Sequence, residues 1–136
     1  MLSQKAKYAL QALAYLAKYH NQGPVLIGTI AEQKKIPLKF LENILLELKN
    51  GGVLTSFRGR TGGYSLNQPP ESIKLTQVIR LMNGPIAMLS CVSLNFYEAC
   101  ENCTQIVCGI NPVMAEARDA VLKVLEHRTV ADIMDK

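Results

Sequence analysis

The chain has 136 residues, of which 49% are hydrophobic, and its formal net charge is +4. This length favours one domain with at most an appendage, and the apolar content suffices for a core without disulfide support. The sequence has neither a run of about 20 apolar residues nor a signal-peptide pattern at its start, which argues against a membrane partner and predicts a cytoplasmic protein.

Positive charge is concentrated in the first half of the chain. Residues 1–68 carry nine Lys and Arg against three Glu, a balance of +6, whereas residues 69–136 carry six against eight acidic residues, a balance of −2. A basic excess is often only a solvated surface, but DNA would use it for phosphate contacts and counterion release. The sequence motifs around these charges distinguish a solvated surface from a DNA-binding one.

The first half has the periodicity of short helices. Apolar residues recur at three- and four-residue steps over 6–17, which predicts an amphipathic helix that ends near 21–24. A second helix is predicted over 29–33, a tight turn over 34–36, and a third helix over 38–50. Two short helices joined by a tight turn are typical of a helix-turn-helix.

The pattern then changes to that of a β-hairpin. Residues 53–58 are rich in β-formers, and residues 64–66 can pair back with them across a glycine-rich loop. Such a hairpin is called a wing when it follows a helix-turn-helix, and here Arg58 and Arg60 can reach a phosphate or the minor groove. The glycines form neither a P-loop nor a dinucleotide-binding pattern, so nucleotide binding is set aside.

A long helix is predicted near the end of the chain, over residues 111–127. Its apolar residues recur at three- and four-residue steps, at Val113/Met114, Ala117, Ala120/Val121 and Val124/Leu125. Such a stripe suits packing against a second helix, either in a homodimer or on the chain's own winged domain. A long helix that follows a loop has little else in its own chain against which to bury this stripe, which favours the homodimer.

All four cysteines of the chain lie in the loop before that helix, at Cys91, Cys100, Cys103 and Cys108. Clustered thiols in a reducing cytosol indicate metal binding or redox chemistry more than a structural disulfide framework. Four thiolates can complete a tetrahedral zinc site or hold an iron–sulfur cluster, and the spacing alone does not choose between them.

Two other classes of function fit the sequence less well. A thiol–disulfide oxidoreductase using Cys100 and Cys103 would need a thioredoxin-like βαβ setting, which the sequence lacks. No arrangement of nucleophile, base and acid indicates another enzyme, so the chain is predicted not to be one. A regulator without a cluster, controlled by a protein partner, stays open, although the four-thiol loop argues weakly against it.

Segments spread over nearly the whole chain match one known arrangement. They are 5–10, 30–32, 40–42, 58–66, 79–85 and 129–133, of which 58–66, with its R-G-x-x-G-G-Y pattern, is the most specific. In this order the segments resemble the Rrf2 family of bacterial winged-helix transcription regulators, which includes IscR-, NsrR- and CymR-like members. The expected fold is mainly helical with a small β-hairpin.

The resemblance implies binding of a double-stranded DNA operator by a homodimer, with the third helix in the major groove and the wing in the minor groove. Candidate DNA contacts are Ser3, Lys5, Tyr8, Thr29, Lys39, Phe40, Glu42, Arg58, Arg60, Thr61 and Gly62. Glu42 could accept a hydrogen bond from a cytosine amino group. Tyr8 fits the core slightly better than the DNA surface.

The resemblance also favours an iron–sulfur cluster in the loop over zinc or thiol redox control. A 2Fe–2S cluster is favoured and a 4Fe–4S cluster is allowed, with Cys91, Cys103 and Cys108 slightly preferred over Cys100 as ligands. The chain departs from its relatives in one respect. IscR-like sites add a histidine and NsrR-like sites an acidic residue of the first helix, whereas no histidine lies near this loop and the matching helix position is Lys7.

Three regions are therefore expected: a DNA-binding region over 1–83, a sensor loop over 84–111, and a dimerisation helix with its tail over 112–136. A change at the cysteines would reorder the loop and alter the placement of the two DNA-reading heads. The operator sequence, the regulated genes, the physiological signal and the direction of regulation are not encoded in any motif of the sequence.

Overall fold

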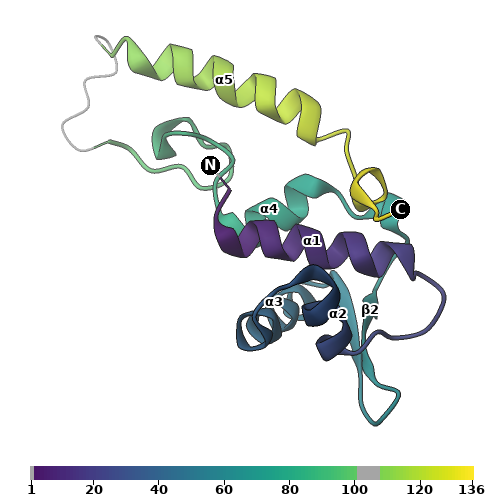
Figure 1. Cartoon of the computed structure of the whole chain (residues 1–136). Coiled ribbons are helices and arrows are strands. Elements are labelled where there is room, and N and C mark those ends of the chain that lie inside the picture. Colours follow the sequence, from purple (N-terminus) through teal and green to yellow (C-terminus); the bar gives the residue numbers. More distant parts are fainter. Residues whose placement is uncertain (1, 101–107) are drawn as a thin grey trace.

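The computed structural model describes residues 2–100 and 108–136. Its central element is α1 (Gln4–Lys18), which begins after Ser3 because the Ser3 hydroxyl accepts a hydrogen bond from the Ala6 backbone N–H at 3.1 Å. Small side chains on the buried face of α1 let other helices approach closely. Figure 1 shows α1 between α4 on one side and α2 and α3 on the other.

The predicted helix-turn-helix is present as α2 (Ile27–Lys34) and α3 (Leu38–Asn50). The third helix has the predicted bounds, whereas the second begins two residues earlier and ends one residue later than its periodicity indicated. Lys35 makes the tight turn in the left-handed conformation, with φ of 54°. The buried side of α3 carries Leu41, Ile44, Leu45 and Leu48.

The wing consists of β1 (Leu54–Phe57) and β2 (Gly63–Leu66), which pair antiparallel. The segment before α2 adds a further pairing, because Val25 and Tyr64 exchange two backbone hydrogen bonds of 2.8 and 2.9 Å. This bridge ties β2 of the wing to the segment that leads into the helix-turn-helix. The wing therefore cannot move freely relative to the two helices.

The chain then passes through a 3₁₀ turn, η1 (Pro70–Ser72), into α4 (Leu75–Asn83), which packs on α1. This helix includes most of the 79–85 segment that carries the family resemblance, and it ends at Asn83. The Asn83 side-chain oxygen accepts a hydrogen bond of 2.8 Å from the Ser3 backbone N–H. The start of α1 and the end of α4 are therefore held together.

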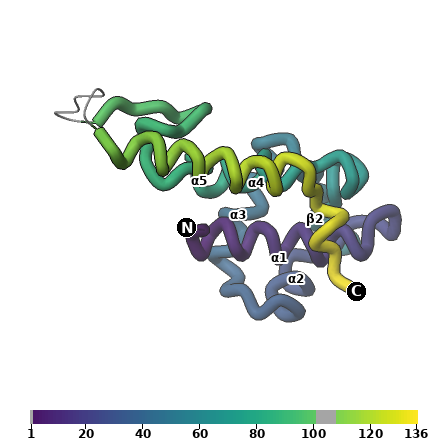
Figure 2. Tube along the Cα trace, turned by 90° about the horizontal axis from the view of Figure 1, so that it is seen from above, coloured from purple at the N-terminus to yellow at the C-terminus, as the bar shows by residue number. Residues whose placement is uncertain are grey.

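The last part of the fold is an outer helix with a returning tail. A short 3₁₀ turn, η2 (Ser90–Val92), lies in the cysteine loop, and α5 (Ile110–Leu125) leads into η3 (Val130–Ile133). The predicted 111–127 helix is thus present with ends one and two residues earlier. Figures 1 and 2 show α5 running along the outer side of α4, away from α2 and α3.

One hydrophobic core unites the winged region with parts of the tail. It includes Leu13, Ile30, Ile44, Val78 and Val130, each fully buried. Among the helices of residues 2–100 and 108–136, none is both long and apolar enough to cross a membrane.

Candidate nucleic-acid interface and cysteine loop

The outer side of α3 carries three of the side chains that the family resemblance implies as DNA contacts. Lys39, Phe40 and Glu42 are exposed, while Leu41 between them is fully buried. This difference follows from the helical period, because Leu41 points into the core whereas Lys39, Phe40 and Glu42 point away from it. The arrangement leaves one cation, one carboxylate and one aromatic ring free to enter a groove.

Tyr8 connects that surface to the core. Its ring meets the Phe40 ring edge-on, with centroids 5.5 Å apart, and its other contacts are with the buried core. Edge-to-face pairs are a favoured aromatic geometry. Tyr8 therefore supports Phe40 from α1, and its half-buried position agrees with the expected core role.

Two other candidates at the start of α1 have structural partners. Ser3 caps the helix, and the Lys5 ammonium lies 2.6 Å from a carboxylate oxygen of Glu47 in α3. These two side chains are 34% and 43% exposed, so solvent screens the pair and its contribution to stability is small. Residue spacing carries no signal of this pair, because the partners belong to different helices.

The wing tip divides into exposed and buried residues. Arg58, Arg60 and Thr61 are exposed, whereas Gly62 is buried and its backbone N–H donates to the Gly59 carbonyl at 3.1 Å. Thr29 is half-buried in α2. The two arginines are therefore the cationic side chains that the hairpin presents, and Gly62 shapes the turn that carries them.

The cysteine loop is attached to α5 at two points. The Asn111 side-chain amide donates to the Cys91 sulfur at 3.6 Å, and one Arg118 guanidinium nitrogen donates to the Val92 carbonyl at 2.7 Å. Both contacts join η2 to α5. Neither contact is predictable from the sequence, because an asparagine or arginine in a helix gives no signal of a partner 20 or 26 residues away.

The described cysteines differ in exposure. Cys91 and Cys108 are half-buried and Cys100 is exposed, while Cys103 lies outside the described residues. Within residues 2–100 and 108–136, no three His, Cys, Asp or Glu side chains gather into a site able to hold a metal ion. The donor chemistry nevertheless fits a thiophilic metal, because all four candidates are thiols within one short loop.

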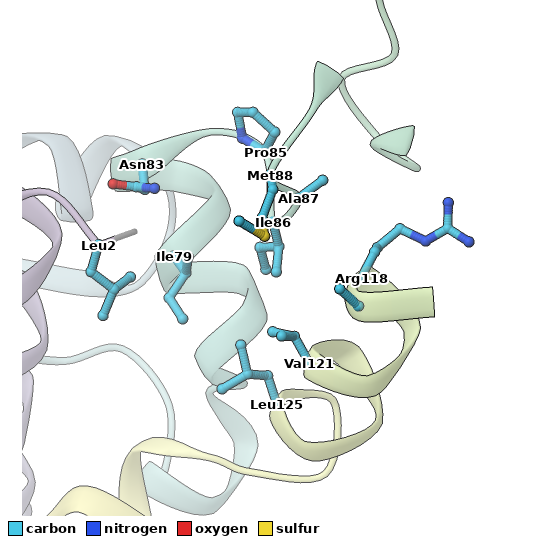
Figure 3. A pocket seen from close by; sticks show the side chains of 11 residues that line it. Leu2, Ile79, Asn83, Pro85, Ile86, Ala87, Met88, Arg118, Val121 and Leu125 are labelled. Atoms are coloured by element: carbon cyan, nitrogen blue, oxygen red, sulfur yellow. The ribbon is translucent and has the colours of Figure 1, made fainter. Parts of the chain in front are cut away.

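A cavity of about 260 Å³ separates α5 from α4 and the segment that follows it. Its lining is almost wholly apolar and includes Ile79, Ile86, Met88, Val121 and Leu125. In Figure 3 the Arg118 guanidinium points away from this cavity. The apolar stripe predicted for the last helix includes Val121 and Leu125 of this lining. The lining residues Ile86 and Met88 were not predicted, because they lie in a loop without periodicity.

The outward side of α5 is also apolar. Val113, Val121 and Val124 are 57%, 46% and 58% exposed, and at 100° per residue they lie on one face with Ala117. Leu122, by contrast, is buried against the rest of the chain. One side of α5 therefore packs against its own chain, and a second side is apolar and exposed.

Comparison with known proteins agrees with this architecture. A model of the Rrf2 family, described as an iron-dependent transcriptional regulator, matches residues 2–136. An rrf2-like HTH-type transcriptional regulator of Rhodobacter capsulatus is 38% identical over 138 residues, which cover 98% of this chain and 92% of the relative.

Solved structures give the same result for the fold. CymR, the global cysteine regulator of B. subtilis, superposes with a TM-score of 0.80 at 31% identity, covering 98% of this chain and 95% of that one. IscR of T. potens gives 0.75 at 29% identity, with coverage of 98% and 85%. The chain therefore belongs to the Rrf2 family and is a DNA-binding transcriptional regulator of the CymR and IscR type, not an enzyme.

Proposed function

We propose that the chain binds its operator as a homodimer and that the cysteine loop controls this binding in the cytoplasm. The observation that carries the proposal is the attachment of η2 to α5 through Asn111–Cys91 and Arg118–Val92. A chemical change at the thiols would act directly on the helix that presents the exposed apolar face. The regions of this mechanism are 1–83 for DNA binding, 84–111 for sensing and 112–136 for dimerisation.

The proposed DNA surface combines the exposed side of α3 with the wing. Lys39, Phe40 and Glu42 would meet the major groove, and Arg58 and Arg60 the minor groove or its phosphates. The remaining candidates, Ser3, Lys5, Tyr8, Thr29, Thr61 and Gly62, would approach the backbone or hold these contacts in place. The balance of +6 over residues 1–68 supplies the electrostatic attraction.

The proposed dimer forms through α5 of two copies. An exposed stripe of valines along about three helical turns would be costly in water, and a second copy of the same helix offers a matching face. The apolar cavity beside Val121 is continuous with that stripe and widens the surface that can be buried. Two-fold symmetry would then place two winged regions on two half-sites of an operator.

The proposed cofactor is an iron–sulfur cluster, with 2Fe–2S favoured over 4Fe–4S, held by thiolates among Cys91, Cys100, Cys103 and Cys108. When bound, such a cluster would supply a group that responds to oxidants and nitric oxide. The description of the family as iron-dependent supports this choice over zinc. The likeness to CymR, a cysteine regulator in its own organism, makes thiol or partner-protein control the second candidate.

Metal analysis tests the cofactor. Protein purified without oxygen is expected to be coloured and to contain iron and acid-labile sulfide, and Cys91→Ser should lose most of both because a thiolate ligand is removed. Ser90→Ala, an exposed neighbour, serves as the matched control and should keep the metal. Colourless protein with stoichiometric zinc and no sulfide would refute the cluster.

A further inference from the structure

The chain does not end at α5 but returns to the helix-turn-helix. The Leu75 N–H donates to the Arg128 carbonyl at 3.1 Å and the Val130 N–H to the Ile73 carbonyl at 2.9 Å, so the two segments pair like short strands. Val130 is fully buried in the core. The segment after α5 is therefore fixed to the winged region along its length.

The tail reaches as far as the reading head, which consists of α1, α2, α3 and the wing. The Asp135 N–H donates to the Ala14 carbonyl of α1 at 3.1 Å, and its carboxylate oxygens lie 2.8 and 3.0 Å from the Lys34 ammonium in α2. The two side chains are 21% and 27% exposed, so this pair is shielded more than the Lys5–Glu47 pair. One residue of the tail thus contacts two helices of the reading head.

The surroundings of Asp135 are polar and crowded. Tyr15 of α1 and Tyr19, which directly follows this helix, line the same pocket, and their ring centroids are 4.9 Å apart. Burial raises the pKa of Tyr15, and hydrogen bonding with Tyr19 and the charge of Asp135 raise it further. The Asp135 carboxylate is therefore close enough to act on α1 as well as on Lys34.

The helix held in this way has little stability of its own. α2 has eight residues, its buried residue is Ile30, and among the described residues no side chain caps its start at Leu26. Helices this short are marginal without tertiary contacts. Anchoring at Lys34, the last residue of α2, therefore affects the whole helix and the turn that sets the direction of α3.

We propose that residues 126–135 form a strap between α5 and the reading head, and that Asp135 is a positioning residue for DNA binding because it holds Lys34. The strap continues directly from α5 and reaches α2 through the Asp135–Lys34 ion pair, in addition to the packing of α5 on α4. In this way the inference deepens the proposed function and rests on it. A displacement of α5 would be transmitted to α2, and through the following turn to α3, by the strap and its Asp135–Lys34 ion pair.

The test compares Asp135→Asn with Glu71→Gln, an exposed carboxylate in η1 whose loss changes the net charge equally. The DNA is a duplex that the unaltered protein selects from a random-sequence library. Losing a negative charge alone should leave DNA affinity unchanged or raise it. The strap predicts the opposite sign: Asp135→Asn should bind about three- to fivefold more weakly, the range of a partly shielded ion pair.

Two further measurements separate positioning from simple destabilisation. Asp135→Glu keeps the carboxylate and should restore most of the affinity, and amide exchange in 27–36 should be faster in Asp135→Asn but not in Glu71→Gln. If Asp135→Asn binds the selected duplex as tightly as Glu71→Gln, the strap is wrong. If the unaltered protein selects no duplex, the proposed function itself has failed.

Discussion

Replacement of Gly63 by alanine is expected to lower the free energy of unfolding by about 2–4 kcal/mol. Gly63 has φ of +133°, and an added Cβ would overlap the Val25 carbonyl that accepts a hydrogen bond from Tyr64. The alanine must therefore distort the backbone and break the bridge that joins the wing to α2. Urea unfolding of the purified protein measures this loss.

Gly59→Ala is the matched control for this substitution. Gly59 also has positive φ, +100°, but no described atom lies within 4 Å of its added Cβ. Its replacement should therefore cost only the strain of the left-handed region, about 1–2 kcal/mol. Equal losses for the two variants would mean that the Val25–Tyr64 bridge adds nothing to the position of the wing.

The double variant Val121→Glu/Val124→Glu is expected to convert the proposed dimer to a monomer at micromolar concentration. Both valines belong to the exposed face of α5, and the two-fold axis would bring four carboxylates into one interface. Burying unpaired charges costs several kcal/mol, which corresponds to a weakening of dimerisation by roughly a hundredfold or more. Sedimentation equilibrium measures the change.

Lys123→Glu provides the control, because it changes the net charge by −2, as the two valine substitutions together do. Lys123 is exposed and, at about 100° per residue, lies beside the valine stripe rather than within it. This variant should remain dimeric. A monomeric unaltered protein, or a double variant as dimeric as Lys123→Glu, would remove α5 from the interface.

Much of the fold was predictable because its signals are local. The bounds of α3 follow from Pro37, the leucine periodicity and the glycines at 51–52, and those bounds are confirmed. The wing follows from β-forming residues around a glycine-rich turn and is also confirmed. Family membership rested on the order of such segments rather than on any one of them.

The features that were not predicted depend on contacts between distant residues. The Lys34–Asp135 pair spans 101 positions, and the bridge from Val25 to Tyr64 joins a loop to a strand. Periodicity carries no information about such pairs. The short 3₁₀ turns lack a period long enough to read, and the earlier start of α2 was hidden because Gly28 interrupts its first turn.

The cysteine site is predictable only in part. The sequence identifies the thiols and their loop, and the structure adds the contacts that join Cys91 and Val92 to α5. The ligand set depends on how the loop folds around a bound group, and Cys103 lies outside the described residues. These residues therefore stay a prediction based on donor chemistry.

Control of DNA binding by the cysteine loop is tested most directly by one comparison of affinities. The Kd for a duplex selected from a random-sequence library is measured for cluster-loaded and cluster-free protein at the same salt concentration. We predict a difference of about five- to 150-fold, which corresponds to a coupling free energy of about 1–3 kcal/mol. Equal Kd values for the two forms would contradict control by the loop.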